Sequence, residues 1–75
     1  MWIRRHDGSL VNIEMCYEIN SVKTGNGYEI NAWRDGSRSI LATYKEENQA
    51  EEAKMFIFCR MRKGDKAITM PYLES

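Results

Sequence analysis

The stretch NQAEEAKMFIFCRMRKG, residues 48–64, carries the signals of a single helix, and the rest of the chain is interpreted from it. Asn48 followed three residues later by Glu51 is a capping-box arrangement, which predicts a helix start just after Asn48. Acidic side chains gather near the start of the stretch and basic ones near its end, an order that suits the helix macrodipole. Gly64 is a typical helix stop. We therefore predict a helix over residues 49–63.

The apolar residues of this predicted helix lie on two opposite sides of it. At about 100° per residue, one stripe spans about 80° and is expected to pack on a sheet: Ala50, Ala53, Ile57 and Met61. Three more apolar residues point roughly the other way, with Phe58 at the border of the first stripe: Met55, Phe56 and Cys59. A helix that is apolar all round is normally covered all round. Since one small sheet covers only one side, three interpretations stay open for the other: a second copy of the chain, the tail at residues 67–73, or exposure to solvent.

Upstream of the helix, closely spaced turn signals separate strand-like segments. HDGS, TGNG and RDGS contain Asp-Gly or Asn-Gly pairs, which are typical of tight hairpin turns. YEINAWR and SILATY alternate in hydrophobicity with a period of two, which indicates a sheet with one buried face. LVNIEMCYEINSVK shifts its spacing, which indicates either two extended pieces joined by a kink near residues 12–15 or a bulge near residues 20–21. We predict an α+β fold: an antiparallel sheet of about four strands in a meander, with one C-terminal helix packed on one face.

A chain of 75 residues has room for one core. We assign residues 1–63 to a sheet-plus-helix domain and residues 64–75 to a C-terminal tail. Within the tail, residues 67–70 form a predicted short strand that ends at Pro71. This strand either lies on the chain's own sheet or crosses to a partner as an exchanged arm, and the sequence leaves both open.

The surplus of apolar surface predicts self-association. A core of this size supplies only roughly 3–5 kcal/mol, and small domains often gain stability from a second copy. Trp33 and Leu41 fall on the opposite face of their strands from the predicted buried face, which adds a second apolar surface. We therefore predict a homo-oligomer, most often a two-fold dimer, with this candidate interface: Met55, Phe56, Cys59, Trp33 and Leu41.

Charge argues against a polycationic nucleic-acid binder. The chain carries 11 basic and 11 acidic side chains, so its net charge is zero. One segment, RMRKGDK at residues 60–66, is nevertheless basic, and with Trp33 it would form an aromatic-flanked patch. The alternative function is therefore a nucleic-acid-binding accessory protein with these contacts: Arg4, Arg5, Arg60, Arg62, Lys63 and Lys66.

The sequence contains no recognisable catalytic or metal-binding constellation. His6 lies in a turn with no nucleophile or substrate pocket implied around it, and we interpret it as an exposed loop histidine. Cys16 and Cys59 are interpreted as reduced, buried thiols, because no secretory leader is recognised and neither residue starts a helix. No segment approaches the roughly 20 apolar residues of a membrane span. We predict a cytoplasmic, non-enzymatic structural or protein-interaction module, with an unidentified protein as an alternative partner to a second copy, and with no cofactor, no metal and no membrane partner.

Three segments carry a resemblance to known proteins: MWIRRHDGSLVNIE, YEINAW and LATYKEENQAEEA. Their order resembles a group of small bacterial and phage-related proteins of mostly unknown function, in which a meander of strands is followed by one helix. More loosely, the chain is similar to small flagellar-operon proteins, which share the opening turn and the final helix. The resemblance covers about residues 1–62. It implies a bacterial or phage origin and this fold, and it implies no activity.

Overall fold

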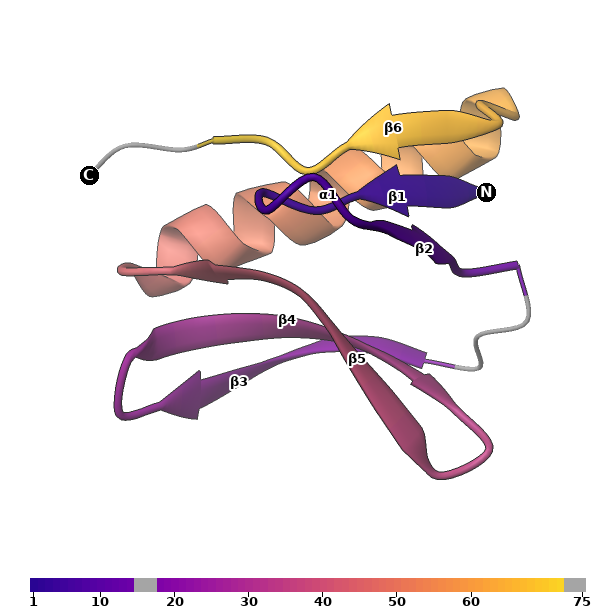
Figure 1. The fold of residues 1–75 in the computed structure, drawn as a ribbon. Coiled ribbons are helices and arrows are strands. Elements are labelled where there is room, and N and C mark those ends of the chain that lie inside the picture. The colour runs from indigo at the N-terminus through magenta and orange to yellow at the C-terminus, as the bar shows by residue number, and fades with distance from the viewer. Residues whose placement is uncertain (15–17, 73–75) are drawn as a thin grey trace.

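The computed structural model describes residues 1–14 and 18–72, and within them it contains six strands and one helix (Figure 1). In chain order the elements are β1 (Trp2–Arg4), β2 (Leu10–Asn12), β3 (Glu18–Thr24), β4 (Gly27–Arg34), β5 (Ser37–Tyr44), α1 (Glu47–Lys63) and β6 (Ala67–Thr69). The predicted α+β class with a C-terminal helix is confirmed.

The described strands form two three-stranded sheets, where the sequence predicted one sheet of about four strands. β3, β4 and β5 form the predicted antiparallel meander, and β1 lies between β2 and β6 in the other sheet. β1 is antiparallel to β2 and parallel to β6. The parallel pair is possible because the meander and the helix together form the long connection that a parallel neighbour requires. Figure 1 shows the two sheets one above the other, with α1 running across behind them.

The extended strand conformation is interrupted after β2, and this interruption separates the strands of the two sheets. The Asn12 side chain accepts a hydrogen bond from the backbone N–H of Glu14 at 2.9 Å, a local turn that ends the strand. The Ile13 N–H donates to the Met1 carbonyl at 2.9 Å, and this bond holds the residue after β2 beside the start of β1. Of the two interpretations of this segment, two extended pieces is therefore the correct one. Residue 15 of the predicted kink lies outside the described residues.

The helix begins two residues earlier than predicted. Its N-cap is Glu46, not Asn48, and Glu46 forms a capping box with Gln49 in which Gln49 Oε1 accepts the Glu46 N–H at 3.0 Å. Gln serves at the third helical position as well as Glu does. This acidic stretch therefore contains two overlapping capping-box patterns, Glu46 with Gln49 and Asn48 with Glu51, and the structure uses the first. Gly64 ends the helix as predicted, with a left-handed φ of 80° and its N–H donating to the Met61 carbonyl at 3.0 Å.

One core lies between the two sheets and the helix. Its buried members come from both sheets, the helix and the tail: Ile3, Ile13, Ile30, Ala32, Leu41, Ala42, Tyr44, Ala50, Ala53, Ile57 and Met70. α1 contacts all three strands of the meander. Because Met70 is fully buried in this cluster, the described part of the tail belongs to the same core as residues 1–63.

A register shift in the meander corrects the predicted position of Leu41. Ile30 pairs with Ala42 and Asn31 pairs with Ile40, so Leu41 is an extra residue in β5 at a β-bulge. The bulge turns Leu41 into the core, where it is 1% exposed, and leaves Ile40 partly exposed at 37%. Simple alternation predicted the reverse for both residues. Leu41 is therefore not part of the surface, and it drops out of the candidate interface.

Gly27, the first residue of β4, provides a test of the meander's geometry. Its φ is +131°, and a Cβ atom at this position would overlap the carbonyl oxygen of Tyr44 in β5. We expect Gly27→Ala to destabilise the protein by about 2–4 kcal/mol, because it adds a backbone conformation unfavourable to alanine to a steric clash. Urea unfolding followed by circular dichroism measures the loss.

The matched control is Gly25→Ala, in the same hairpin. A Cβ at Gly25 meets nothing within 4 Å, and Gly25 lacks the left-handed φ of Gly27. This variant should change the free energy of unfolding by less than about 0.5 kcal/mol. Equal losses for the two variants would contradict the β4–β5 packing described above.

Candidate interaction surface

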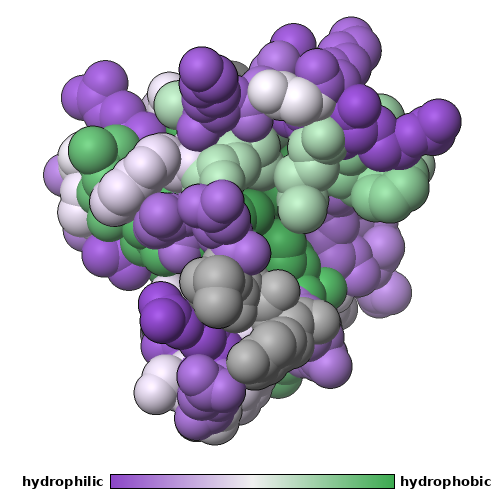
Figure 2. All heavy atoms as spheres, turned by 90° about the vertical axis from the view of Figure 1, so that its right-hand side faces the viewer, coloured by the Kyte–Doolittle hydropathy of each residue, from purple (hydrophilic) through white to green (hydrophobic). Residues whose placement is uncertain are grey.

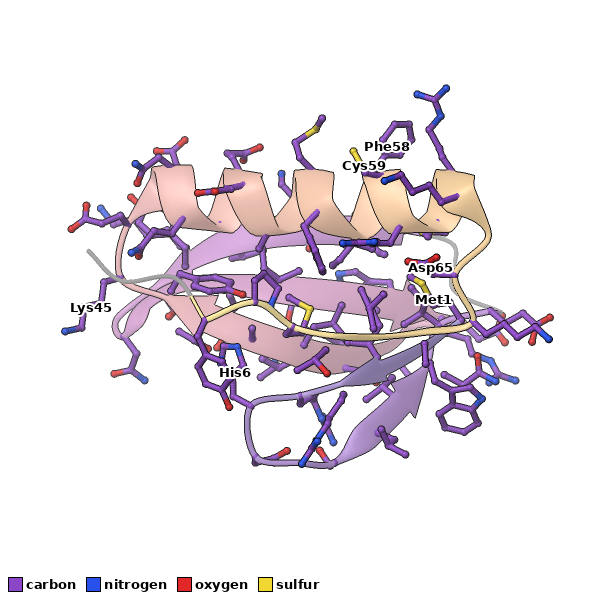
Figure 3. The ribbon with its side chains drawn as sticks, turned by 90° about the horizontal axis from the view of Figure 1, so that it is seen from above. Met1, His6, Lys45, Phe58, Cys59 and Asp65 are labelled. Carbon is purple, nitrogen blue, oxygen red and sulfur yellow. The ribbon has the colours of Figure 1, made fainter. Side chains whose placement is uncertain are left out.

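The side of α1 that faces away from the sheets is apolar and open. Met55, Phe58 and Met61 are 58%, 53% and 48% exposed. We call the line Glu51, Met55, Phe58 and Arg62 the outer helix face, with Cys59 and Met61 at its margins. Its members are spaced four, three and four residues apart, which places them one above another along the helix. Figure 3 shows Phe58 and Cys59 on the side of α1 turned away from the strands.

Shallow grooves run along both sides of this face. One, of about 340 Å³, lies between α1 and β3 and is lined chiefly by Ile19, Met55, Phe58 and Met61. The other, of about 350 Å³, lies on the tail side of Met55 and includes Phe56 and Pro71. The outer helix face is therefore a ridge between two apolar grooves, a shape suited to contact with another helix.

The apolar surface continues around the end of the helix. Met61 also borders a hollow that it shares with Met1 and Ile13. Figure 2 views the end of the molecule that holds the last turn of α1, and it shows hydrophobic atoms across the upper half with hydrophilic side chains above and below them. An apolar area bordered by polar side chains is typical of surfaces that contact another macromolecule.

Charged side chains border the outer helix face at both ends. Glu51 is paired with Lys54 at 2.9 Å and accepts a hydrogen bond from Ser21 Oγ at 3.5 Å. At the other end, the Arg62 guanidinium lies over the Phe58 ring, 5.8 Å from its centroid. The Glu51 carboxylate is about half exposed, so its ion pair contributes little to stability and leaves acceptor sites free.

The structure brings together only part of the predicted interface. Met55 and Cys59 are exposed on α1, and Phe56 is half-buried beside Pro71. Cys59 was predicted to be a buried thiol, and the structure corrects this, because its side chain is exposed. Cys16 lies outside the described residues. Trp33 is half-buried on β4, where its Nε1–H donates to Asn20 Oδ1 at 3.3 Å.

Sequence reasoning missed two members of this surface. Phe58 was placed at the border of the inward stripe and Met61 inside it, whereas both are about half exposed. The inward stripe consists only of Ala50, Ala53 and Ile57 among the apolar residues of α1. The two alanines were the available signal, because small residues bring a helix close to a sheet and narrow the strip that it buries.

The part of the tail that the structure describes, up to residue 72, does not cover this surface. β6 pairs with β1 of the same chain, Ile68 opposite Ile3, so of the two alternatives left open for this predicted strand it takes the one on the chain's own sheet. Beyond β6, Pro71 reaches the groove at Phe56. Met55 and Phe58 remain exposed, so among the described residues the chain itself does not seal the outer helix face.

His6 is held by the tail and is not the exposed loop histidine predicted. Its ring stacks on Tyr72 with centroids 4.1 Å apart and meets Tyr44 edge-on at 6.0 Å. His6 Nε2 lies 3.0 Å from the Pro71 carbonyl, which also accepts the Tyr44 hydroxyl at 2.7 Å. The Tyr72 hydroxyl donates to the His6 carbonyl at 3.1 Å. We call His6, Tyr44, Pro71 and Tyr72 the tail latch, because they join segments 65 residues apart.

The tail latch lies apart from the outer helix face. Figure 3 shows His6 beside the tail and far from Phe58 and Cys59. Since the His6 ring is already engaged with Pro71 and Tyr72, its contacts have the character of packing that holds the tail to the first turn.

Of the six basic residues predicted to contact nucleic acid in the alternative hypothesis, two make hydrogen bonds or ion pairs within the described part of the chain. Arg5 donates to Ser9 Oγ at 2.7 Å and to the Ile40 carbonyl at 3.3 Å. Arg60 pairs with Asp65 at 3.5 Å and lies over the Phe56 ring at 5.1 Å. The other four candidates are exposed: Arg4, Arg62, Lys63 and Lys66.

Neither a metal centre nor a membrane span is found in the described ranges. No group of three or more His, Cys, Asp or Glu side chains there is placed to hold a metal ion. The helix in these ranges is not long and apolar enough to cross a bilayer.

Comparison with known proteins adds no relationship. No protein-family model matches the chain, and neither a curated protein nor a solved structure matches it. The surface itself is therefore the available indication of function.

The tail latch predicts a specific alkaline sensitivity. Burial raises the pKa of Tyr44 to about 12, above the value of about 10 for an unfolded chain. The contribution of the neutral phenol to stability is therefore complete below about pH 10 and is lost as the pH rises toward 12. We expect Tyr44→Phe to lower the free energy of unfolding by about 0.5–1.5 kcal/mol at pH 7, through loss of the bond to Pro71. Above pH 10 its stability should decline less steeply than that of the wild type.

Tyr72→Phe is the control for this experiment. Tyr72 is 70% exposed, and its hydroxyl makes a longer bond, to the His6 carbonyl. This variant should keep the wild-type slope of melting temperature against pH between 10 and 12. Identical slopes for Tyr44→Phe and the wild type would show that Tyr44 does not titrate with a raised pKa.

Proposed function

We propose that this protein is a non-enzymatic interaction module that self-associates through the outer helix face. The observation that carries the proposal is the half-exposed row of Met55, Phe58 and Met61 on a helix whose other side is buried. Full burial of a Phe or Met side chain is worth roughly 1.5–3 kcal/mol. Covering the exposed half of these three would contribute on the order of 2–4 kcal/mol, comparable with the whole core of so small a domain.

A second copy is the simplest occupant of this surface. An isologous contact needs one patch that fits itself, and a ridge with a groove on each side offers both partners the same shape. The setting that we propose is the cytoplasm, and the proposed origin is bacterial or phage. The resemblance of MWIRRHDGSLVNIE and LATYKEENQAEEA to small proteins of that kind supports this setting.

Solution mass tests self-association. The mass of the chain is 8.8 kDa, and we expect it to double across the micromolar range in sedimentation equilibrium. Phe58→Asp places a charge in the middle of the apolar row, and it should weaken the association at least about tenfold. Its circular dichroism spectrum should stay that of the wild type, because the Phe58 side chain is half in solvent already.

Leu10→Asp is the matched control, because Leu10 is 61% exposed on β2, outside the outer helix face. It should leave the association constant unchanged within about twofold. A wild type that stays monomeric at every concentration would overturn the proposal. So would loss of association in Leu10→Asp but not in Phe58→Asp.

Nucleic-acid binding is the alternative, supported by two exposed cations, Arg62 over the Phe58 ring and Lys63 next to it in the sequence. If it holds, a fluorescent single-stranded oligonucleotide should bind with an affinity that falls steeply with added salt. Arg62→Ala with Lys63→Ala should reduce that binding, and Phe58→Asp alone should not remove its salt dependence. The zero net charge of the chain argues that self-association is the better supported of the two.

A further inference from the structure

The outer helix face has a pattern that reads the same from both ends. Its spacings are four, three and four residues, so Glu51 and Arg62 share their midpoint with Met55 and Phe58. Along this line the side chains run acidic, apolar, apolar, basic. A line with this symmetry of spacing and opposite charges at its ends is complementary to a reversed copy of itself.

We propose that a second copy of this chain docks with its α1 antiparallel to the first, about a two-fold axis that passes between Phe56 and Ile57. In this register Met55 of one chain meets Phe58 of the other, and Glu51 meets Arg62. The inference rests on the proposed self-association and adds the partner's orientation and register. Each pair occurs twice in the dimer, because a two-fold axis makes the contact of residue i with j also the contact of j with i.

The apolar pair at the centre has suitable chemistry. Met55 is flexible and carries a polarizable sulfur, which makes favourable contacts with aromatic rings such as Phe58. Both side chains border the groove between α1 and β3. In this register the partner's Phe58 enters the groove and packs against its apolar lining residues, Ile19 and Met61. Their exposure of 58% and 53% leaves most of each side chain available to the partner.

Charge selects this register over the competing ones. A parallel pair of helices would bring Glu51 close to Glu51 and Arg62 close to Arg62. An antiparallel pair centred on Phe58 would set Lys54 against Arg62. The proposed register instead makes two attractive pairs, and it aligns the two helix dipoles in opposite directions, which is favourable for neighbouring helices.

The existing contacts at both ends are compatible with the new pairs. Glu51 already binds Lys54 at 2.9 Å, but a carboxylate has about four acceptor sites and takes a second cation readily. Arg62 already lies over Phe58 with its centre 5.8 Å from the ring centroid, which holds the guanidinium above the ring that the partner would contact. Both charged groups are therefore positioned before association.

Charge reversal tests the register directly. Glu51→Arg alone and Arg62→Glu alone should each weaken self-association about three- to tenfold at low salt, because each turns two attractive pairs into two repulsive ones. The double variant, Glu51→Arg with Arg62→Glu, should restore association to within about twofold of the wild type. These effects should shrink when ionic strength is raised to about 1 M, where charges are screened within a few ångströms.

Mixing provides a second measurement, which tests the register together with the loss of association expected for each single variant. Glu51→Arg chains carry two positive ends, and Arg62→Glu chains carry two negative ends. In the proposed register an equimolar mixture forms a heterodimer with attractive pairs at both ends, so it should associate more tightly than either variant alone. Differently labelled fluorescent chains report this by energy transfer, and circular dichroism confirms that each variant is folded.

The outcomes separate this inference from the proposed function. If the wild type dimerises and Phe58→Asp abolishes the dimer, but neither the double variant nor the mixture recovers association, then the antiparallel register is wrong and self-association stands. If the wild type is a monomer at every concentration, the proposed function fails and the register fails with it. Recovery in both the double variant and the mixture supports the register.

Discussion

The close approach of α1 to the meander, set by Ala50 and Ala53, is the constraint on which the rest of the structure depends. Both alanines are fully buried, and Ile57 is the large apolar side chain that the helix directs into the core beside them. Small residues at the contact let the backbones approach, so the buried strip is narrow. A narrow strip leaves the other large apolar residues outside it, which is why Met55 and Phe58 form an open surface.

Local signals made much of the fold predictable. The helix and its end at Gly64 follow from capping, charge order and periodicity within a few residues of sequence. The meander strands follow from turn pairs and alternation. The errors come from features without a local signature. The bulge that buries Leu41 and exposes Ile40 depends on pairing with β4. Asn31, which alternation places on the polar face, is fully buried, and its amide makes no hydrogen bond to the described residues.

The candidate surface was predictable in location but not in membership. A helix wheel locates an excess of apolar circumference, and Met55 and Cys59 were placed correctly on the outside. Its resolution is too coarse to say where the buried strip ends, so Phe58 and Met61 were assigned to the wrong side or to the border. The tail latch was beyond sequence reasoning altogether, because His6 gains its contacts from residues at the far end of the chain.

The parallel pairing of β1 with β6 has a consequence for how the molecule is assembled in time. β1 and β2 are joined by a tight turn, so their pairing is local in sequence. The pairing of Ile3 with Ile68 joins residues that are far apart in the sequence. Closing so long a loop is entropically expensive and slow compared with hairpin or helix formation. The β1–β2 hairpin is therefore expected to form before β6 joins it, and until then one edge of β1 stays without a neighbour. The pairing of β6 with β1 also brings the two most distant strands of this fold side by side, so it is expected to be a late step of folding.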